Sequence, residues 1–153
     1  MSFRRDAYCG LYCGACPHFL ATENGTLETF AAEKGMTPDE ALCHGCKSDH
    51  LRVNAWCASC TYKACAREKG FDFCYECADY PCEGLVGFIN DQDWPYHILV
   101  PENMERIQQD GLSAWLEAQD ARWRCEVCGT KHSWYGGTCE TCGAPLRGWQ
   151  EGN

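Results

Sequence analysis

The chain has 153 residues, 15 cysteines and a formal net charge of −9. This length suits a single domain, or one domain with a small appendage. The sequence contains no run of roughly 18 apolar residues that could span a bilayer, and residues 1–6 lack the apolar stretch of a secretion signal. We therefore expect a cytoplasmic protein with no membrane partner. The acidic charge disfavours binding to the phosphate backbone of nucleic acids.

Twelve of the fifteen cysteines form CxxC pairs, and Cys9, Cys65 and Cys82 stand alone. The pairs are Cys13/Cys16, Cys43/Cys46, Cys57/Cys60, Cys74/Cys77, Cys125/Cys128 and Cys139/Cys142. Two thiolates at this spacing can bind one metal ion from a tight turn. In a reducing compartment, many cysteines indicate metal ligands more often than disulfides. The sequence thus predicts that all fifteen cysteines bind metal, as three to four zinc ions.

Four stretches between the cysteines carry helix signals: residues 26–34, 37–40, 61–69 and about 101–121. The first two begin at a threonine that can cap a helix, and Pro38 follows the second threonine at the first helical position. Glycine follows residues 26–34 and 61–69, as is common after a helix. In the last stretch Leu112, Trp115 and Leu116 share one helix face, which predicts packing against a core.

The cysteines divide the chain into three segments. Eleven lie in residues 1–82, none in 83–124 and four in 125–142. We expect a cysteine-rich metal-binding module over residues 1–90, a helical bridge over 91–123 and a zinc ribbon over 124–147. The predicted fold is a small, metal-stapled, α-rich irregular domain plus a C-terminal β-hairpin zinc ribbon.

The N-terminal cysteines can be assigned to metals in several ways. A ten-residue gap separates Cys43/Cys46 from Cys57/Cys60, which is the spacing of a ribbon site. In that scheme Cys65, Cys74, Cys77 and Cys82 form a second site, and Cys9, Cys13 and Cys16 need His18 or His44 as a fourth ligand. Alternatively, Cys13/Cys16 joins another CxxC pair. A third possibility is that the CxxCx4C repeat, 57–65 and 74–82, holds two bridged metals.

The last four cysteines predict a closed structural zinc site. Each CxxC is followed by glycine, Gly129 or Gly143, which tolerates the positive φ of a turn around an ion. Four thiolates complete the tetrahedron and leave no position for a catalytic water. The aromatic and basic side chains of residues 131–135 lie between the pairs, where we expect them to cover the small zinc core.

The N-terminal residues resemble a known family. The segments that carry the resemblance are Tyr8-Cys-Gly-Leu-Tyr-Cys-Gly-Ala-Cys-Pro-His-Phe19, Cys43-His-Gly-Cys46, Cys57-x2-Cys60-x4-Cys65 and Cys74-x2-Cys77-Ala-Asp-Tyr-Pro-Cys82. Over residues 6–90 they are similar to the DUF3795 family, small cysteine-rich bacterial and archaeal proteins with no assigned function. The resemblance implies a cytosolic zinc-binding protein and supplies no reaction.

The sequence contains no nucleophile–base motif, no Walker A loop and no dinucleotide-binding glycine motif, so we expect a protein that is not an enzyme. The function predicted is that of an adaptor or protein-interaction module with structural zinc sites. One alternative is an iron–sulfur protein, since thiolates bind iron as well as zinc, or a thiol redox protein, in which Cys9 could remain as a free reactive thiol. Another alternative is nucleic-acid binding through the zinc ribbon, which the net charge disfavours.

Overall fold

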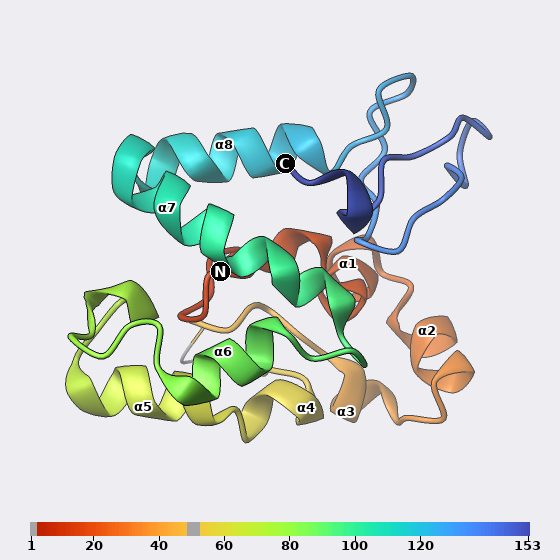
Figure 1. Cartoon of the computed structure of the whole chain (residues 1–153). Helices are drawn as coiled ribbons and strands as arrows, with labels where there is room; N and C mark the ends of the chain where they lie inside the picture. The colour runs from red at the N-terminus through yellow and green to blue at the C-terminus, as the bar shows by residue number, and fades with distance from the viewer. Residues whose placement is uncertain (1–2, 49–52) are drawn as a thin grey trace.

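The computed structural model describes residues 3–48 and 53–153. In these residues the regular elements are helical (Figure 1). The α-helices are α1 (Pro17–Asn24), α2 (Leu27–Glu33), α3 (Pro38–Ala41), α4 (Ala55–Ala58), α5 (Thr61–Lys69), α6 (Glu83–Ile89), α7 (Val100–Asp110) and α8 (Leu112–Arg122). Short 3-10 helices occupy η1 (Cys13–Ala15), η2 (Cys74–Glu76), η3 (Pro95–Leu99) and η4 (Trp149–Glu151). None of the described helices is long and apolar enough to cross a membrane.

Local sequence signals account for several helix ends. Thr37 and Glu40 form a capping box at the start of α3, in which the Glu40 N–H donates to Thr37 Oγ1 at 3.2 Å and Glu40 Oε2 accepts the Thr37 N–H at 2.8 Å. Gly70 ends α5 in the left-handed conformation, with a φ of 72°. The predicted stretch 101–121 forms two helices, because Gly111 at φ 86° and ψ 158° interrupts it.

The helices form two tiers with the N-terminal segment between them (Figure 1). The helices α7 and α8 pack against each other in one tier, while α4, α5 and α6 lie in the other. The chain after α8 loops out and then returns, so that its C-terminus lies beside α8. This return is held by hydrogen bonds from Arg122 Nε to the Gly152 carbonyl at 2.8 Å and from Asn153 Nδ2 to Asn103 Oδ1 at 2.8 Å.

One hydrophobic core draws residues from all three sequence segments. Its buried members are Tyr12, Ala15, Phe73, Leu99, Val100, Met104, Ile107, Trp115, Trp123 and Trp134. Tyr12 meets Trp115 edge-on with ring centroids 5.9 Å apart, and Trp134 stacks on Tyr96 at 3.9 Å. The apolar face predicted on residues 112–116 therefore packs into this core through Trp115. Packing of this kind makes the cysteine-bearing segments depend on one another for stability.

The predicted C-terminal β-hairpin is wrong. The structure has no β-strand among its described residues, and within 124–147 the only pairing is two isolated antiparallel bridges, Arg124 with Lys131 and Thr138 with Pro145. Each CxxC turn closes on itself through one such bridge. Pro145 lacks an N–H to extend a ladder, and Gly136 and Gly137 between the turns are poor strand formers. The segment consequently consists of two linked turns instead of a hairpin.

Replacing Gly45 with alanine is expected to destabilise the fold strongly. Gly45 has a φ of 106°, and a Cβ there would lie 1.8 Å from the Arg4 carbonyl oxygen. The Arg4 N–H donates to the His44 carbonyl at 3.0 Å, so relieving the clash would break the contact between these segments. We expect a loss of about 2–4 kcal/mol in urea denaturation, from backbone strain and lost packing. Gly25→Ala is the control, because Gly25 has a φ of 73° and open space around it. If both variants lost the same stability, the clash with the Arg4 carbonyl oxygen would not be the cause.

Candidate metal centres

The four C-terminal thiols lie close enough to share one ion. Cys125 Sγ and Cys142 Sγ are 3.6 Å apart, and Cys128 Sγ and Cys139 Sγ are 3.5 Å apart. All four sulfur atoms lie within 4.8 Å of one another, which holds for no other group of three or more possible ligands in residues 3–48 and 53–153. A tetrahedral ion with metal–sulfur bonds of about 2.3 Å places its sulfurs about 3.8 Å apart. This group could therefore hold a metal ion.

Two equivalent turns present these thiols. In the first, the Cys125 N–H donates to the Thr130 carbonyl at 2.9 Å and the Gly129 N–H donates to the Cys125 carbonyl at 2.8 Å. The second turn, fourteen residues later (139 − 125 = 14), repeats both bonds at 2.8 Å. Gly129 and Gly143 both have a φ of 76°, as the sequence predicted for the residue after each CxxC. The repeated geometry points both pairs of thiols at one centre.

Local hydrogen bonds favour the thiolate form in the first turn. The Thr130 hydroxyl and N–H hydrogen-bond to the Cys128 sulfur, with Oγ1 at 3.2 Å, and lower the pKa of Cys128 to about 6. The backbone N–H groups of Cys128 and Val127 likewise lower the pKa of Cys125. Thiolates are the form that binds metal, so these donors favour a metal site.

The loop between the two turns joins the rest of the molecule. Lys131 Nζ lies 3.0 Å from Glu23 Oε2 on α1, and Trp134 is buried against Tyr96. Tyr135 remains exposed at 51%. Trp134 thus packs into the hydrophobic core of the helical part, whereas Tyr135 faces solvent; coverage of the metal site by this loop stays a prediction.

The N-terminal cysteines are all free thiols. Cys9 and Cys43 are buried, Cys65 and Cys82 are exposed, and the others are half-buried. The Cys74 N–H donates to the carbonyl of Tyr8 at 2.9 Å, which brings Cys74 close to the residue that follows, Cys9. Burial, and then the charges of Cys82 and Cys65, raise the pKa of Cys74 to about 11. The grouping of Cys65, Cys74, Cys77 and Cys82 in one metal site stays a prediction.

Three of these thiols occupy helix N-termini. Cys16 is the N-cap residue of α1, Cys60 of α5 and Cys82 of α6. The N-terminus of a helix offers unpaired N–H groups and a partial positive charge, both of which stabilise a thiolate. At Cys16 the N–H groups of His18 and Phe19 donate to the sulfur. The start of α1 thus supplies donors to Cys16, a possible metal ligand.

Sequence reasoning missed two residues that position thiols. Asn54 is 2% exposed, caps α4 through its Oδ1, which accepts the Cys57 N–H at 3.1 Å, and places its Nδ2 3.5 Å from Cys57 Sγ. Thr22 Oγ1 accepts the Cys43 N–H at 3.0 Å. An asparagine three residues before a cysteine in a helix-starting position is the signal that could have identified Asn54. Nothing in the local sequence marks Thr22.

The two histidines considered as ligands have other contacts. His18 Nδ1 lies 3.0 Å from the Ala41 carbonyl oxygen, and its ring meets Phe30 edge-on. Burial lowers the pKa of His18. His44 packs on Phe3 with ring centroids 4.9 Å apart. Packing and a hydrogen bond to the backbone thus account for His18, whereas His44 Nδ1 is buried without a hydrogen-bond partner among the described residues.

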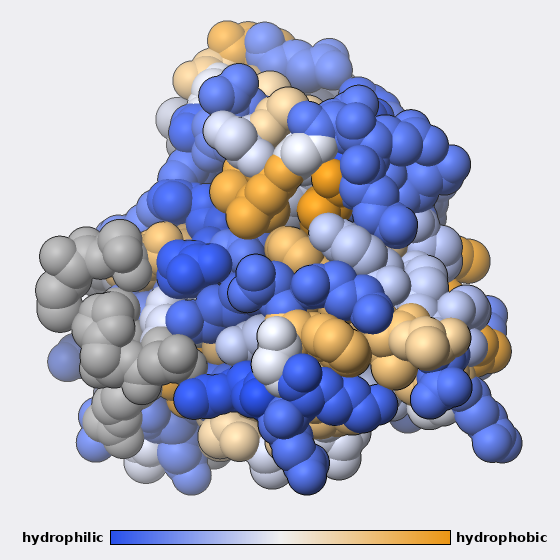
Figure 2. Space-filling model, turned by 90° about the vertical axis from the view of Figure 1, so that its left-hand side faces the viewer, coloured by the Kyte–Doolittle hydropathy of each residue, from blue (hydrophilic) through white to orange (hydrophobic). Residues whose placement is uncertain are grey.

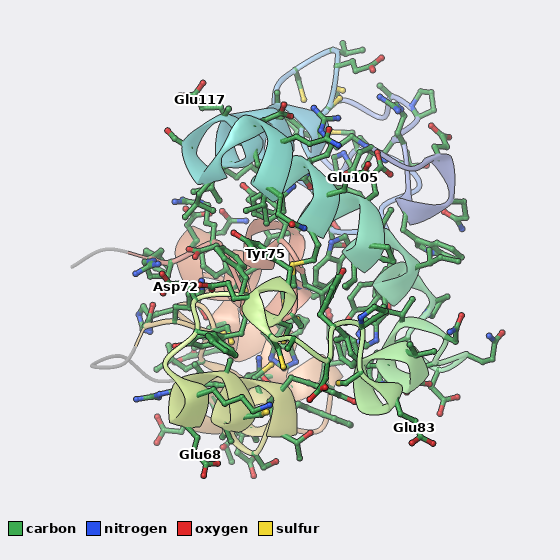
Figure 3. All side chains as sticks on the ribbon, turned by 60° about the vertical axis from the view of Figure 1, so that its left-hand side comes forward. Glu68, Asp72, Tyr75, Glu83, Glu105 and Glu117 are labelled. Atoms are coloured by element: carbon green, nitrogen blue, oxygen red, sulfur yellow. The ribbon has the colours of Figure 1, made fainter. Side chains whose placement is uncertain are left out.

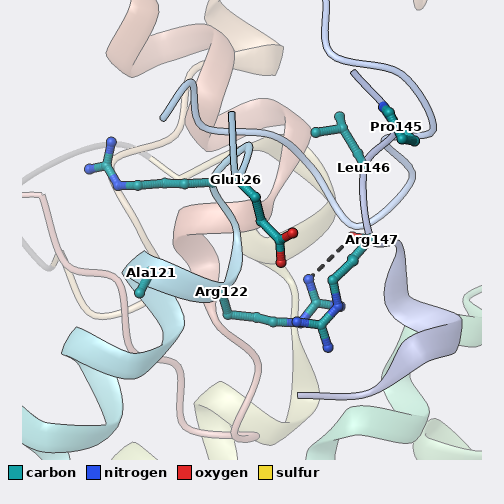
Figure 4. A pocket seen from close by; sticks show the side chains of 7 residues that line it. Ala121, Arg122, Glu126, Pro145, Leu146 and Arg147 are labelled. Carbon is teal, nitrogen blue, oxygen red and sulfur yellow. Dashed lines mark hydrogen bonds between the residues drawn. The ribbon is translucent and has the colours of Figure 1, made fainter. Parts of the chain in front are cut away.

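A shallow cavity of about 280 Å³ lies beside the C-terminal thiols, lined by Ala121, Arg122, Arg124, Glu126, Pro145, Leu146 and Arg147 (Figure 4). Its arginines are engaged within the protein. Arg122 donates to the backbone carbonyls of residues 147, 148 and 152, Arg124 pairs with Asp120 at 3.0 Å, and Arg147 pairs with Glu151 at 3.1 Å. Arg122 thus holds the C-terminal return of the chain, and all three guanidinium groups have partners within the protein.

The face formed by α5 to α8 is acidic and hydrophilic. Figure 2 shows hydrophilic residues over most of this side of the molecule, with small hydrophobic areas between them. Glu68, Asp72, Glu83, Glu105 and Glu117 project outward from separate elements on it (Figure 3). Among the acids near the cysteines, Glu76 has a structural role, because its Oε2 accepts the N–H groups of Asp72 and Phe73, each at 2.7 Å.

Comparison with known proteins identifies the family. No curated protein and no solved structure matches the chain. A family model described as "Protein of unknown function (DUF3795)" matches residues 5–86, which is more than half of the 153 residues and includes the eleven N-terminal cysteines. The C-terminal four-thiol group lies outside the match. The chain therefore belongs to the DUF3795 family and carries, beyond the family region, a second cysteine group that could hold a metal ion.

Proposed function

We propose that this protein is a zinc-binding adaptor, in which structural metal sites hold a fold that binds another protein. The observation that carries the proposal is the geometry of Cys125, Cys128, Cys139 and Cys142, whose sulfurs lie 3.5–3.6 Å apart in two pairs. Four thiolates and no open position favour zinc in a structural role over a catalytic one. The remaining cysteines are proposed as further ligands, for a total of three to four ions.

Elemental analysis and a visible spectrum test the metal. We expect protein purified without air and without added metal to contain three to four zinc ions per chain and to be colourless. Loading with Co²⁺ should then give the intense blue-green bands of tetrahedral thiolate coordination. Brown protein that contains iron and acid-labile sulfide would contradict zinc and favour the iron–sulfur alternative.

An exposed aromatic pair supports the interaction part of the proposal. Trp56 is 64% exposed and Trp94 is 39% exposed, and their rings meet edge-on with centroids 5.7 Å apart. Large exposed tryptophans are unusual on a protein without a partner and are enriched where partners bind. Asp91 and Asp93 precede Trp94, and the overall charge is −9. The partner that fits is a protein segment carrying apolar and basic side chains.

The substitution Trp56→Ala together with Trp94→Ala tests this surface. We expect the double variant to keep its metal content and its cooperative unfolding, because both rings lie at the surface. Affinity for a partner identified with the wild-type protein and then purified should fall by about 100-fold or more, as for paired hot-spot residues. Val127→Ala, which removes a side chain that is 75% exposed elsewhere, is the control. Undiminished binding by the double variant would reject this surface.

A further inference from the structure

Two exposed tryptophans form a corner on the surface of the molecule. Trp56 lies on α4 and Trp94 lies between α6 and η3, and their ring planes meet at an angle of 73°. More than half of Trp56 and more than a third of Trp94 are exposed to solvent. Since most of the surface of an indole belongs to its two faces, this exposure leaves ring faces as well as ring edges accessible. The corner between the two rings therefore opens to solvent.

The backbone holds both rings in place. Asn54, which is buried, caps α4 through its side chain and so fixes the turn from which Trp56 projects. The Trp94 N–H donates to the Asp91 carbonyl at 3.3 Å, and the Trp94 carbonyl accepts the His97 N–H at 3.0 Å. Both tryptophans thus project from hydrogen-bonded turns, which lowers the entropic cost of ordering them when a ligand binds.

The dimensions of the corner suit a positively charged group. The faces of an indole ring carry a negative electrostatic potential, which attracts a cation that lies within about 6 Å of the ring centre. The centroids of Trp56 and Trp94 are 5.7 Å apart. In a corner of this size, a group that lies about 4 Å from each ring plane is within about 6 Å of both ring centres. One ammonium or guanidinium group can therefore contact two ring faces at once.

The chain around the corner has no positive charge of its own. Residues 71–105, which include Trp94, contain eight aspartates and glutamates and no lysine or arginine. Residues 53–62, which include Trp56, contain none of these four residue types. The segments that carry the two rings therefore have a large excess of negative charge, which attracts cations to this part of the surface.

Several of these carboxylates are placed to act on an approaching cation. Asp91 and Asp93 lie in the turn that leads into Trp94, where the Asp93 N–H donates to Asp91 Oδ1 at 2.9 Å. Glu83 of α6 and Glu105 of α7 project outward from the same side of the molecule (Figure 3). A partner with basic side chains thus meets charge of the opposite sign before it contacts the rings.

Cations of the chain itself lie over other rings. Arg122, for example, lies over the ring of Trp123, with its Cζ 4.1 Å from the ring centre. Within residues 3–48 and 53–153, no lysine or arginine lies over Trp56 or Trp94. The described residues therefore give these two rings no cation from within the protein.

We propose that the corner between Trp56 and Trp94 binds a positively charged side chain of the partner protein, the ammonium group of a lysine or the guanidinium group of an arginine. The inference rests on the proposed adaptor function and specifies how the partner is recognised, through charge against two ring faces in addition to apolar contact. Trp56 belongs to the family region and Trp94 lies outside it, so the site needs both parts of the chain.

The site is tested by NMR on the ¹⁵N-labelled wild-type chain, in which the indole N–H signals of Trp56 and Trp94 report on the two rings. The probes are acetyl-Gly-Lys-Gly-amide and its analogue with norleucine, which has the same carbon chain as lysine without the charge. At constant ionic strength, we expect the lysine peptide to shift both signals and to bind about three- to fivefold more tightly than the norleucine peptide. The corresponding arginine peptide should also bind more tightly than the norleucine peptide.

The substitution Trp56→Leu separates the effect of the ring face from that of apolar contact. Leucine keeps an apolar side chain but has no ring face, so we expect this variant to bind the lysine and norleucine peptides equally. Its metal content and its unfolding should match the wild type, because Trp56 lies at the surface. Val127→Leu, a change at a side chain that is exposed elsewhere, is the control and should keep the preference for lysine.

Two results would overturn the inference, and they bear differently on the proposed function. Equal binding of both peptides by the wild type would exclude recognition of the charge and leave an apolar aromatic surface, as the adaptor function requires. If neither peptide shifted the indole signals, the corner would not be a site for basic side chains. The binding of the purified partner to the double variant of Trp56 and Trp94 then decides the adaptor surface separately.

Discussion

Replacing Cys139 with serine is expected to remove one zinc ion and most of the stability of residues 124–147. Cys139 is 4% exposed and lies 3.5 Å from Cys128 Sγ. Structural zinc contributes roughly 10–16 kcal/mol of apparent binding free energy to small domains of this type, and without it two short turns have little to hold them. We expect native mass spectrometry to show one ion fewer and the amide signals of 124–147 to lose dispersion.

The same variant tests how far the three predicted segments are independent. The sequence predicts that the N-terminal module stays folded when the C-terminal site is lost. The structure places Trp134 in the core shared with Tyr12 and Trp115, and Lys131 beside Glu23. We therefore expect the remaining protein to unfold at a lower urea concentration. Val127→Ser, an exposed change in the same turn, is the control. An unchanged ion count in Cys139→Ser would exclude zinc from this group.

Replacing Lys47 with methionine is expected to cost about 3–5 kcal/mol, because it leaves a buried carboxylate with one cation fewer. Lys47 Nζ lies 2.8 Å from Asp6 Oδ2, with side-chain exposures of 4% and 2%. The ammonium also lies 3.6 Å from the centre of the Phe73 ring. Arg4 is the second partner of Asp6, at 3.2 Å, but it is largely exposed and compensates only in part. Urea denaturation at pH 7 measures the loss.

The pH dependence of this contribution follows from the Asp6 pKa. Burial opposes ionisation of Asp6, but hydrogen bonds from Arg4 and Lys47 outweigh it and lower the pKa of Asp6 below its usual value. A carboxyl whose pKa is lowered by folding stabilises the protein above its unfolded pKa, and this stabilisation disappears as the pH falls through the folded value. In Lys47→Met we expect the NMR titration of Asp6 to move to higher pH.

Two controls accompany this prediction. Lys34→Met removes a cation that contacts Phe30 at the surface, at 6.0 Å from the ring centre, and should change stability by less than about 1 kcal/mol. Adding Asp6→Asn to Lys47→Met removes the unpaired charge and should recover part of the loss. Equal losses of stability in Lys34→Met and Lys47→Met would show that the buried Lys47–Asp6 ion pair contributes no more than a surface cation.

The sequence by itself determined the features that short stretches of chain encode. The capping box at Thr37, the helix end at Gly70 and the two CxxCG turns each depend on residues within about five positions of one another. The resemblance of the N-terminal motifs to the DUF3795 family is confirmed by the family model over residues 5–86.

Only the tertiary structure decided which distant segments meet. The Arg4 N–H reaches the His44 carbonyl and the Cys74 N–H reaches the Tyr8 carbonyl, contacts across forty to sixty-six positions (44 − 4 = 40, 74 − 8 = 66) that no local pattern encodes. Those contacts bring Cys46 and Cys13 into the hydrophobic cluster that contains Cys9. The hairpin prediction failed for a related reason: the CxxCG turns specify their own geometry, but strand pairing between them depends on partners that Pro145 and the neighbouring glycines do not provide.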